Sequence, residues 1–168
     1  MTLDINRILI PLDFSTNSEI ALDYARSLAQ RFGAAVHLVH VCDVPSLVAS
    51  PAESYASCTE WSQSLADEAG RQLAALQKRL PDVRTSTEVL FGNPARCIVT
   101  AANVERSDLI VMGTHGRGLM MNVLTGNVAE RVVRTAPCPV LTVREPREKV
   151  RELEQRPVAM AVTCAVGP

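Results

Sequence analysis

Short apolar runs rich in branched residues alternate along this chain with segments whose apolar residues recur at helical spacing. The runs cover residues 7–12, 34–41, 85–91, 108–112 and 139–143. Runs of this length bounded by turn residues are typical of buried strands, and a helix between consecutive strands is the usual connection in a parallel sheet. The alternation of five strands with four helices therefore predicts an α/β fold, a doubly wound parallel sheet with helices on both faces.

Turn and capping residues mark the expected ends of these elements. Thr16 and Glu19 have capping-box spacing and predict the start of the first helix, which Gly33 is expected to end. Residues 43–59 carry prolines and serines without a period and predict a long loop, followed by a helix over 61–80. Asn93 and Pro94 are suited to cap and open the third helix, after a run over 85–91 that alternates as an edge strand does.

Composition limits the function classes that are open to this chain. It has 168 residues, 47% of them hydrophobic but only 4% aromatic, so we expect a domain with an aliphatic core. A net charge of −1 and scattered arginines argue against a nucleic-acid binder. The first residues lack signal-sequence architecture, no apolar run has the length of a membrane span, and the five cysteines include no CxxC pair. We therefore expect a cytoplasmic protein without a membrane or nucleic-acid partner.

The character of the sequence changes after the last apolar run. Residues 144–156 are dense in charge, and residues 157–166 are apolar but too short to span a bilayer. We predict one domain over residues 1–144 and a C-terminal tail over residues 145–168, a charged segment followed by a short apolar one.

A glycine-rich segment extends from the fourth apolar run to the last predicted helix. Gly113, Gly116 and Gly126 follow the spacing G-x₂-G-x₉-G, whereas neither a P-loop nor a complete Rossmann glycine motif is present. Glycines let backbone N–H groups converge on an anion, and a helix N-terminus adds partial positive charge. With strand order 3-2-1-4-5, strands one and four flank the switch point where such sheets bind ligands, and these strands end near Asp13 and Gly113. The segment predicts a nucleotide-phosphate site.

Five dispersed motifs resemble one known family. They are the glycine spacing, Ile8-Leu-Ile-Pro-Leu-Asp-Phe-Ser, His37-Leu-Val-His-Val, Gly92-Asn-Pro, and Ala136-Pro-Cys-Pro-Val-Leu-Thr-Val. Together they cover roughly residues 4–144, in the order found in the ATP-binding branch of the universal stress protein family, which the chain resembles. The resemblance implies an adenine nucleotide alpha hydrolase-like fold, ATP as a regulatory ligand with Mg²⁺ assisting, and a homodimer formed through the fifth strand.

The resemblance also implies which positions contact the nucleotide. Pro11 and Asp13 would line the adenine and ribose end, Val41 would offer backbone contacts to the base, and the others would lie beneath the nucleotide or around its phosphates. The implied binding residues are Pro11, Asp13, Val41, Met112, Gly113, Gly116, Arg117, Gly126, Asn127 and Val128. Asn127 stands where the family pattern has Ser or Thr, which places the contact to the terminal phosphate in question.

Three functions remain open at this point. The first is an ATP-binding universal stress protein acting in stress adaptation. The second is a slow ATPase or nucleotidyl transferase, although there is no Walker lysine or convincing base, and we assign no catalytic residue. The third is a dimeric module that is nucleotide-free or binds AMP and acts through a protein partner. His37 and His40 are expected to be packing residues, and no Cys/His cluster favours a metal site.

Overall fold

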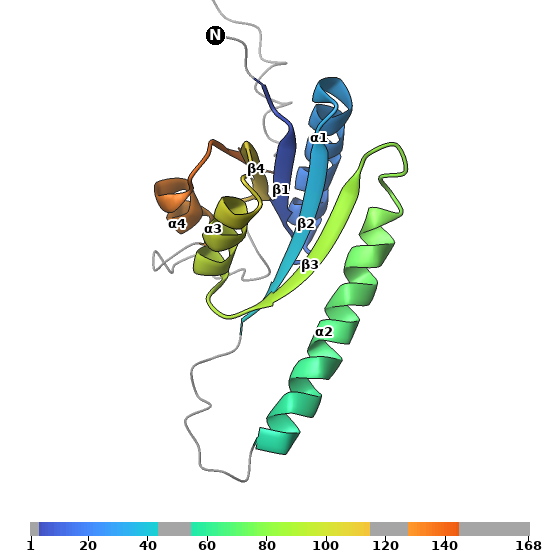
Figure 1. Cartoon of the computed structure of the whole chain (residues 1–168), viewed down its shortest axis with the longest axis vertical. Coiled ribbons are helices and arrows are strands. Elements are labelled where there is room, and N and C mark those ends of the chain that lie inside the picture. The colour runs from blue at the N-terminus through green and yellow to red at the C-terminus, as the bar shows by residue number, and fades with distance from the viewer. Residues whose placement is uncertain (1–3, 44–54, 115–127, 145–168) are drawn as a thin grey trace, which may run out of the picture.

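Five parallel strands form one sheet at the centre of the structure (Figure 1). The computed structural model describes residues 4–43, 55–114 and 128–144. The sheet order is β3-β2-β1-β4-β5, which confirms the predicted fold class and strand order. The strands are β1 (Arg7–Pro11), β2 (Ala35–Cys42), β3 (Thr85–Phe91), β4 (Leu109–Gly113) and β5 (Val140–Val143).

Helices cover both faces of the sheet, and alternate strand residues supply each face with its core. The helices are α1 (Thr16–Phe32), α2 (Tyr55–Gln77), α3 (Pro94–Val104) and α4 (Val128–Thr135). Ile8 and Ile10 of β1 pack with α1 and α2, whereas Leu9 packs with α3 and α4 on the opposite face. Within the described residues, no helix combines the length and apolar character needed to cross a membrane.

The ends of two helices differ from those predicted. Helix α1 begins at Thr16, but its cap is Ser15, whose Oγ accepts a hydrogen bond from the Ser18 N–H at 3.3 Å. The capping box predicted at Thr16 is therefore wrong by one residue, because Thr16 is already helical. Gly33 ends the helix with φ 68°, as predicted. Helix α2 begins at Tyr55, before the predicted residue 61, because residues 55–60 contain no glycine or proline that would stop it.

Candidate functional site

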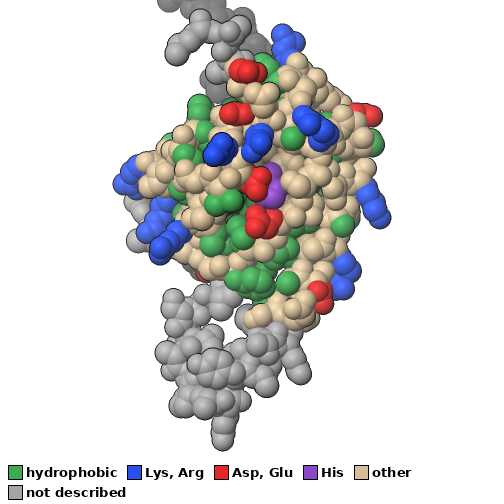
Figure 2. All heavy atoms as spheres, viewed as in Figure 1, with side chains coloured by type: hydrophobic (Ala, Val, Ile, Leu, Met, Phe, Trp, Pro, Cys, Tyr) green, Lys and Arg blue, Asp and Glu red, His purple; other side chains and the backbone are tan. Residues whose placement is uncertain are grey.

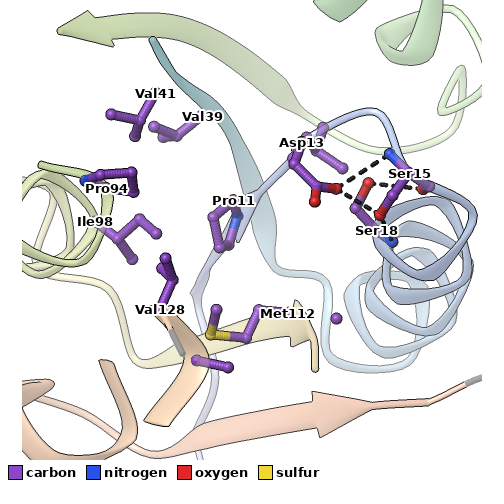
Figure 3. Close-up of a pocket in the computed structure, with 13 residues that line it drawn as sticks. Pro11, Asp13, Ser15, Ser18, Val39, Val41, Pro94, Ile98, Met112 and Val128 are labelled. Atoms are coloured by element: carbon purple, nitrogen blue, oxygen red, sulfur yellow. Dashed lines mark hydrogen bonds between the residues drawn. The ribbon is translucent and has the colours of Figure 1, made fainter. Parts of the chain in front are cut away.

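A pocket of about 210 Å³ opens at the carboxyl ends of β1 and β4 (Figure 3). These two strands pair with each other, and the chain winds outward from them in opposite directions, to β2 and β3 on one side and to β5 on the other. The pocket therefore lies at the topological switch point, where ligands bind in open parallel sheets. Pro11 and Asp13 line it from the end of β1, and Met112 and Gly113 from the end of β4.

One side of the pocket is an apolar wall built from three elements. Val39 and Val41 project from β2, Pro94 and Ile98 from α3, and Val128 from the start of α4 (Figure 3). Val39 and Ile98 are buried in the core on this face of the sheet, so the wall is held in place by packing. A flat apolar group of a ligand could bind against this wall and displace the water that would otherwise contact it.

The opposite side is polar and is centred on Asp13. Its Oδ1 accepts hydrogen bonds from the Ser15 N–H at 3.1 Å and from the Ser15 hydroxyl at 2.6 Å. The Ser18 hydroxyl donates to the Ser15 carbonyl at 2.9 Å, and Ser18 is 3% exposed. This network orients the Asp13 carboxylate at the pocket, while Ser15 also caps α1 by accepting from the Ser18 N–H (Figure 3).

Three helices present their first residues to this pocket. Ser15 caps α1 and Ser18 lies in its first turn, Pro94 is the first residue of α3, and Val128 is the first residue of α4. A helix N-terminus carries partial positive charge and unpaired backbone N–H groups. Three of them around one cavity favour an anionic ligand over a cationic one.

The turn that carries Asp13 is held in an uncommon conformation. Phe14 has φ 59°, a value that bulky residues rarely adopt. Its ring stacks on the ring of His40 with centroids 4.5 Å apart, and His40 Nδ1 donates to the Leu12 carbonyl at 2.7 Å. His40 thus packs, as predicted, and also fixes the turn by a hydrogen bond. The strained turn beside the pocket is typical of a functional site.

Gly113 is needed for packing as well as for lining the pocket. A Cβ at this position would lie 3.0 Å from the carbonyl carbon of Asn17 and 3.1 Å from the carbonyl oxygen and Cβ of Asn17. These distances are shorter than normal van der Waals contact, and the atoms belong to the first turn of α1. The glycine therefore allows the end of β4 to approach the first turn of α1, next to the Ser15 cap that binds Asp13.

The structure brings together six of the ten residues predicted to bind nucleotide. Around one pocket lie Pro11, Asp13, Val41, Met112, Gly113 and Val128. The other four, Gly116, Arg117, Gly126 and Asn127, lie outside the described residues. Residues that line the pocket but were not predicted are Leu12, Ser15, Ser18, Val39, Pro94, Ile98 and Ala129. Ser15 and Ser18 lie shortly after Asp13 in the sequence and could have been included, whereas Pro94 and Ile98 come from a helix that is distant in the sequence.

The free thiols of the described residues are poorly suited to nucleophilic chemistry. Burial raises the pKa of Cys42, and burial is also the main cause of the raised pKa values of Cys97 and Cys138. A raised pKa lowers the thiolate fraction at neutral pH. Among the described residues no group of three His, Cys, Asp or Glu side chains is placed to hold a metal ion.

Comparison with known proteins identifies close relatives over most of the chain. A family model described as the universal stress protein family matches residues 4–144. Universal stress protein MJ0531 of Methanocaldococcus jannaschii is 39% identical over 145 residues, covering 85% of this chain and 84% of that protein. The solved structure of MJ0577, a universal stress protein of the same organism, superposes with a TM-score of 0.75 at 30% identity, covering 86% of this chain and 99% of the other.

More distant structures share the fold. One is a universal stress protein in complex with cAMP, at 21% identity and TM-score 0.61, covering 85% of this chain and 99% of the other. Another is a universal stress protein of Archaeoglobus fulgidus in complex with dAMP, at 20% identity and TM-score 0.52, covering 85% of this chain and 100% of the other. At these identities the likeness supports the fold alone.

Proposed function

This chain belongs to the universal stress protein family, and from that premise we propose that it binds an adenine nucleotide as a regulatory ligand in stress adaptation, with ATP as the preferred nucleotide. The observation that carries the proposal is the convergence of six residues, predicted from separate parts of the sequence, on one pocket at the switch point of the sheet.

The apolar wall suits the adenine ring. Val39 and Val41 on one strand and Ile98 on a facing helix offer flat aliphatic contacts without a charged group. A cavity of about 210 Å³ is smaller than the roughly 300–1,000 Å³ of sites that enclose whole drug-sized ligands. We therefore assign base and ribose to this cavity and place the phosphates beyond it. Both cAMP and dAMP, the ligands of two relatives with this fold, contain the adenine base.

The phosphates are assigned to the glycine-rich segment. The described residues at its two ends, Gly113 and Val128, both line the pocket, which supports this assignment. The N-termini of α1, α3 and α4 carry partial positive charge, which favours negatively charged phosphates. Asp13 is the only carboxylate among the described residues that line the pocket, so we propose that Mg²⁺ binds together with the triphosphate. The roles of Gly116, Arg117, Gly126 and Asn127 remain predictions.

Asp13 is assigned to the ribose hydroxyls, and a conservative change tests that role. Asp13→Asn keeps an oxygen that can accept from the Ser15 N–H and hydroxyl, so the variant should fold, with an unfolding free energy lowered modestly by the loss of negative charge near the N-terminus of α1. It removes the charge, and a hydrogen bond to a charged group contributes about 1.5–3 kcal/mol. We expect the Kd for ATP to rise about tenfold or more, measured by calorimetry.

The control for Asp13→Asn is 2′,3′-dideoxy-ATP, which lacks both ribose hydroxyls. This analogue should bind the variant and the unchanged protein with similar affinity. An equal loss of affinity for ATP and for the dideoxy analogue would contradict a ribose contact.

The remaining parts of the proposal concern assembly and location. We propose that β5 pairs with a second copy, because it is a four-residue edge strand with Leu141 37% exposed. The free thiols Cys42, Cys97 and Cys138 fit a reducing compartment, and we propose the cytoplasm.

Purification without added nucleotide, followed by titration with ATP, ADP, AMP and cAMP, tests the function as a whole. We expect ATP to bind and turnover to be negligible over hours. Steady hydrolysis would favour the slow ATPase, preference for AMP would favour the interaction module, and binding of none of the four would overturn the proposal.

A further inference from the structure

A second group of polar side chains lies away from the nucleotide pocket, on β2 and β3. His37 pairs in register with Ser86, and Val39 pairs with Glu88, so His37, Ser86 and Glu88 project from the same face of the sheet. His37 Nδ1 lies 2.7 Å from Ser86 Oγ, and His37 Nε2 lies 3.1 Å from Glu88 Oε2. His37 was predicted as a packing residue on the second strand, and in the structure both of its ring nitrogens are also hydrogen-bonded. Figure 2 shows acidic and basic side chains gathered around a histidine on one face of the molecule.

The hydrogen bonds determine the direction of proton donation. A carboxylate only accepts, so Nε2–H donates to Glu88. In the neutral imidazole Nδ1 is then an acceptor, and it receives the Ser86 hydroxyl proton. The order is serine hydroxyl, imidazole base and orienting carboxylate, which is the arrangement that activates a serine nucleophile.

This group borders a cavity of its own. His37 and Ser86 line a space of about 280 Å³ near the amino ends of β1, β2 and β3, together with Arg7, Arg84 and Ser107. The Ser107 hydroxyl is buried and has no hydrogen-bond partner within the described ranges. The nucleotide pocket lies at the opposite, carboxyl ends of the strands and shares none of these residues.

Two arginines give this cavity positive charge. The Arg84 guanidinium makes no ion pair or hydrogen bond with any part of the chain that the structure describes. Arg7 donates to the backbone carbonyl of Glu105 at 2.7 Å and forms no ion pair within the same ranges. The carboxylate-bearing Glu105 also lines the cavity, so a ligand with one anionic group, rather than a highly charged one, matches the charge of the cavity.

We propose that Ser86, His37 and Glu88 hydrolyse small esters that carry an anionic group. Ser86 Oγ attacks the ester carbonyl carbon while its proton moves to His37 Nδ1. The bond to the leaving alcohol then breaks, and His37 returns the proton to the departing oxygen. Water, deprotonated at Nδ1, hydrolyses the acyl–serine ester and releases the carboxylic acid and free Ser86. Glu88 is a positioning residue that holds Nε2–H, and Arg84 and Arg7 bind the anionic group of the ester.

A fluorophosphonate probe tests the nucleophile on the full chain. We expect a covalent adduct on Ser86, mapped by peptide mass spectrometry, that is absent in Ser86→Ala. His37→Gln should slow labelling by about 100-fold or more, since a positioned general base contributes roughly 10²–10⁴-fold. The matched control is Ser27→Ala, which removes another exposed serine whose hydroxyl bonds only to the Asp23 carbonyl among the described residues. Label on a different residue, no label, or an unchanged rate in His37→Gln would overturn the proposal.

Substrate preference and the role of Glu88 have separate readouts. Arg84→Gln should lower the hydrolysis of mono-4-nitrophenyl succinate more than that of 4-nitrophenyl acetate, and equal effects would contradict the anionic preference.

Glu88→Gln should lower kcat about tenfold or more, because the amide can donate to Nε2 and reverse the tautomer. An unchanged kcat would exclude its positioning role. Blocking the nucleotide pocket should leave this activity intact, so this proposal and that of nucleotide binding can fail independently.

Discussion

Replacing Val41 by tryptophan is expected to raise the Kd for ATP at least tenfold, which corresponds to about 1.4 kcal/mol. Val41 is half-buried at the end of β2 and forms part of the apolar wall of a cavity of about 210 Å³. An indole side chain at this position would occupy the space assigned to the adenine ring. The measurement is calorimetric titration with ATP, together with circular dichroism to show that the variant keeps its fold.

The matched control is Val104→Trp on α3. Val104 is 72% exposed and does not line this pocket, so the same substitution adds an aromatic surface without filling the proposed base site. Its affinity for ATP should equal that of the unchanged protein. If Val41→Trp also binds ATP normally, the adenine ring does not lie against this wall.

Replacing Gly113 by alanine is expected to lower the unfolding free energy by about 1–3 kcal/mol, the usual range for overpacking. The added Cβ meets Asn17 at 3.0–3.1 Å, and two of the three contact atoms belong to the helix backbone, which moves less easily than a side-chain end. Urea unfolding at a fixed protein concentration measures the change.

Gly70 in α2 provides a control of opposite sign. A Cβ at Gly70 meets nothing within 4 Å. Gly70→Ala should therefore raise the unfolding free energy by about 0.5–1 kcal/mol, because alanine has the higher helix propensity. A Gly113→Ala variant as stable as the unchanged protein would show that β4 and α1 are not packed as closely as described.

The sheet could be predicted from the sequence because its signals are local. Each buried strand is a short branched run between turn residues, and α/β connection rules leave few topologies for five such strands. The start of α2 was less predictable, since residues 55–60 carry no apolar period and no breaker. The cap at Ser15 was missed because Thr16 and Ser15 both have capping chemistry, and only backbone geometry separates them.

The site was predictable only in part, for a different reason. Asp13 lies just after β1 and Gly113 ends β4, and these strands meet at the switch point, so topology alone placed the two residues together. Pro94 and Ile98 reach the pocket through the packing of α3 on β2, which no local pattern encodes. The pairing of His37 with Ser86 and Glu88 depends on the β2–β3 register, which was not predicted and cannot be derived from either strand alone.

Photolabelling with 8-azido-ATP tests the central claim most directly, because the azide is on the adenine ring. After irradiation and peptide mapping, we expect label on the apolar wall, at or beside Val39 and Val41 of β2 or Pro94 and Ile98 of α3, and competition by excess ATP. Label confined to peptides that contribute nothing to this pocket, or label that ATP does not displace, would contradict the assignment of the adenine site.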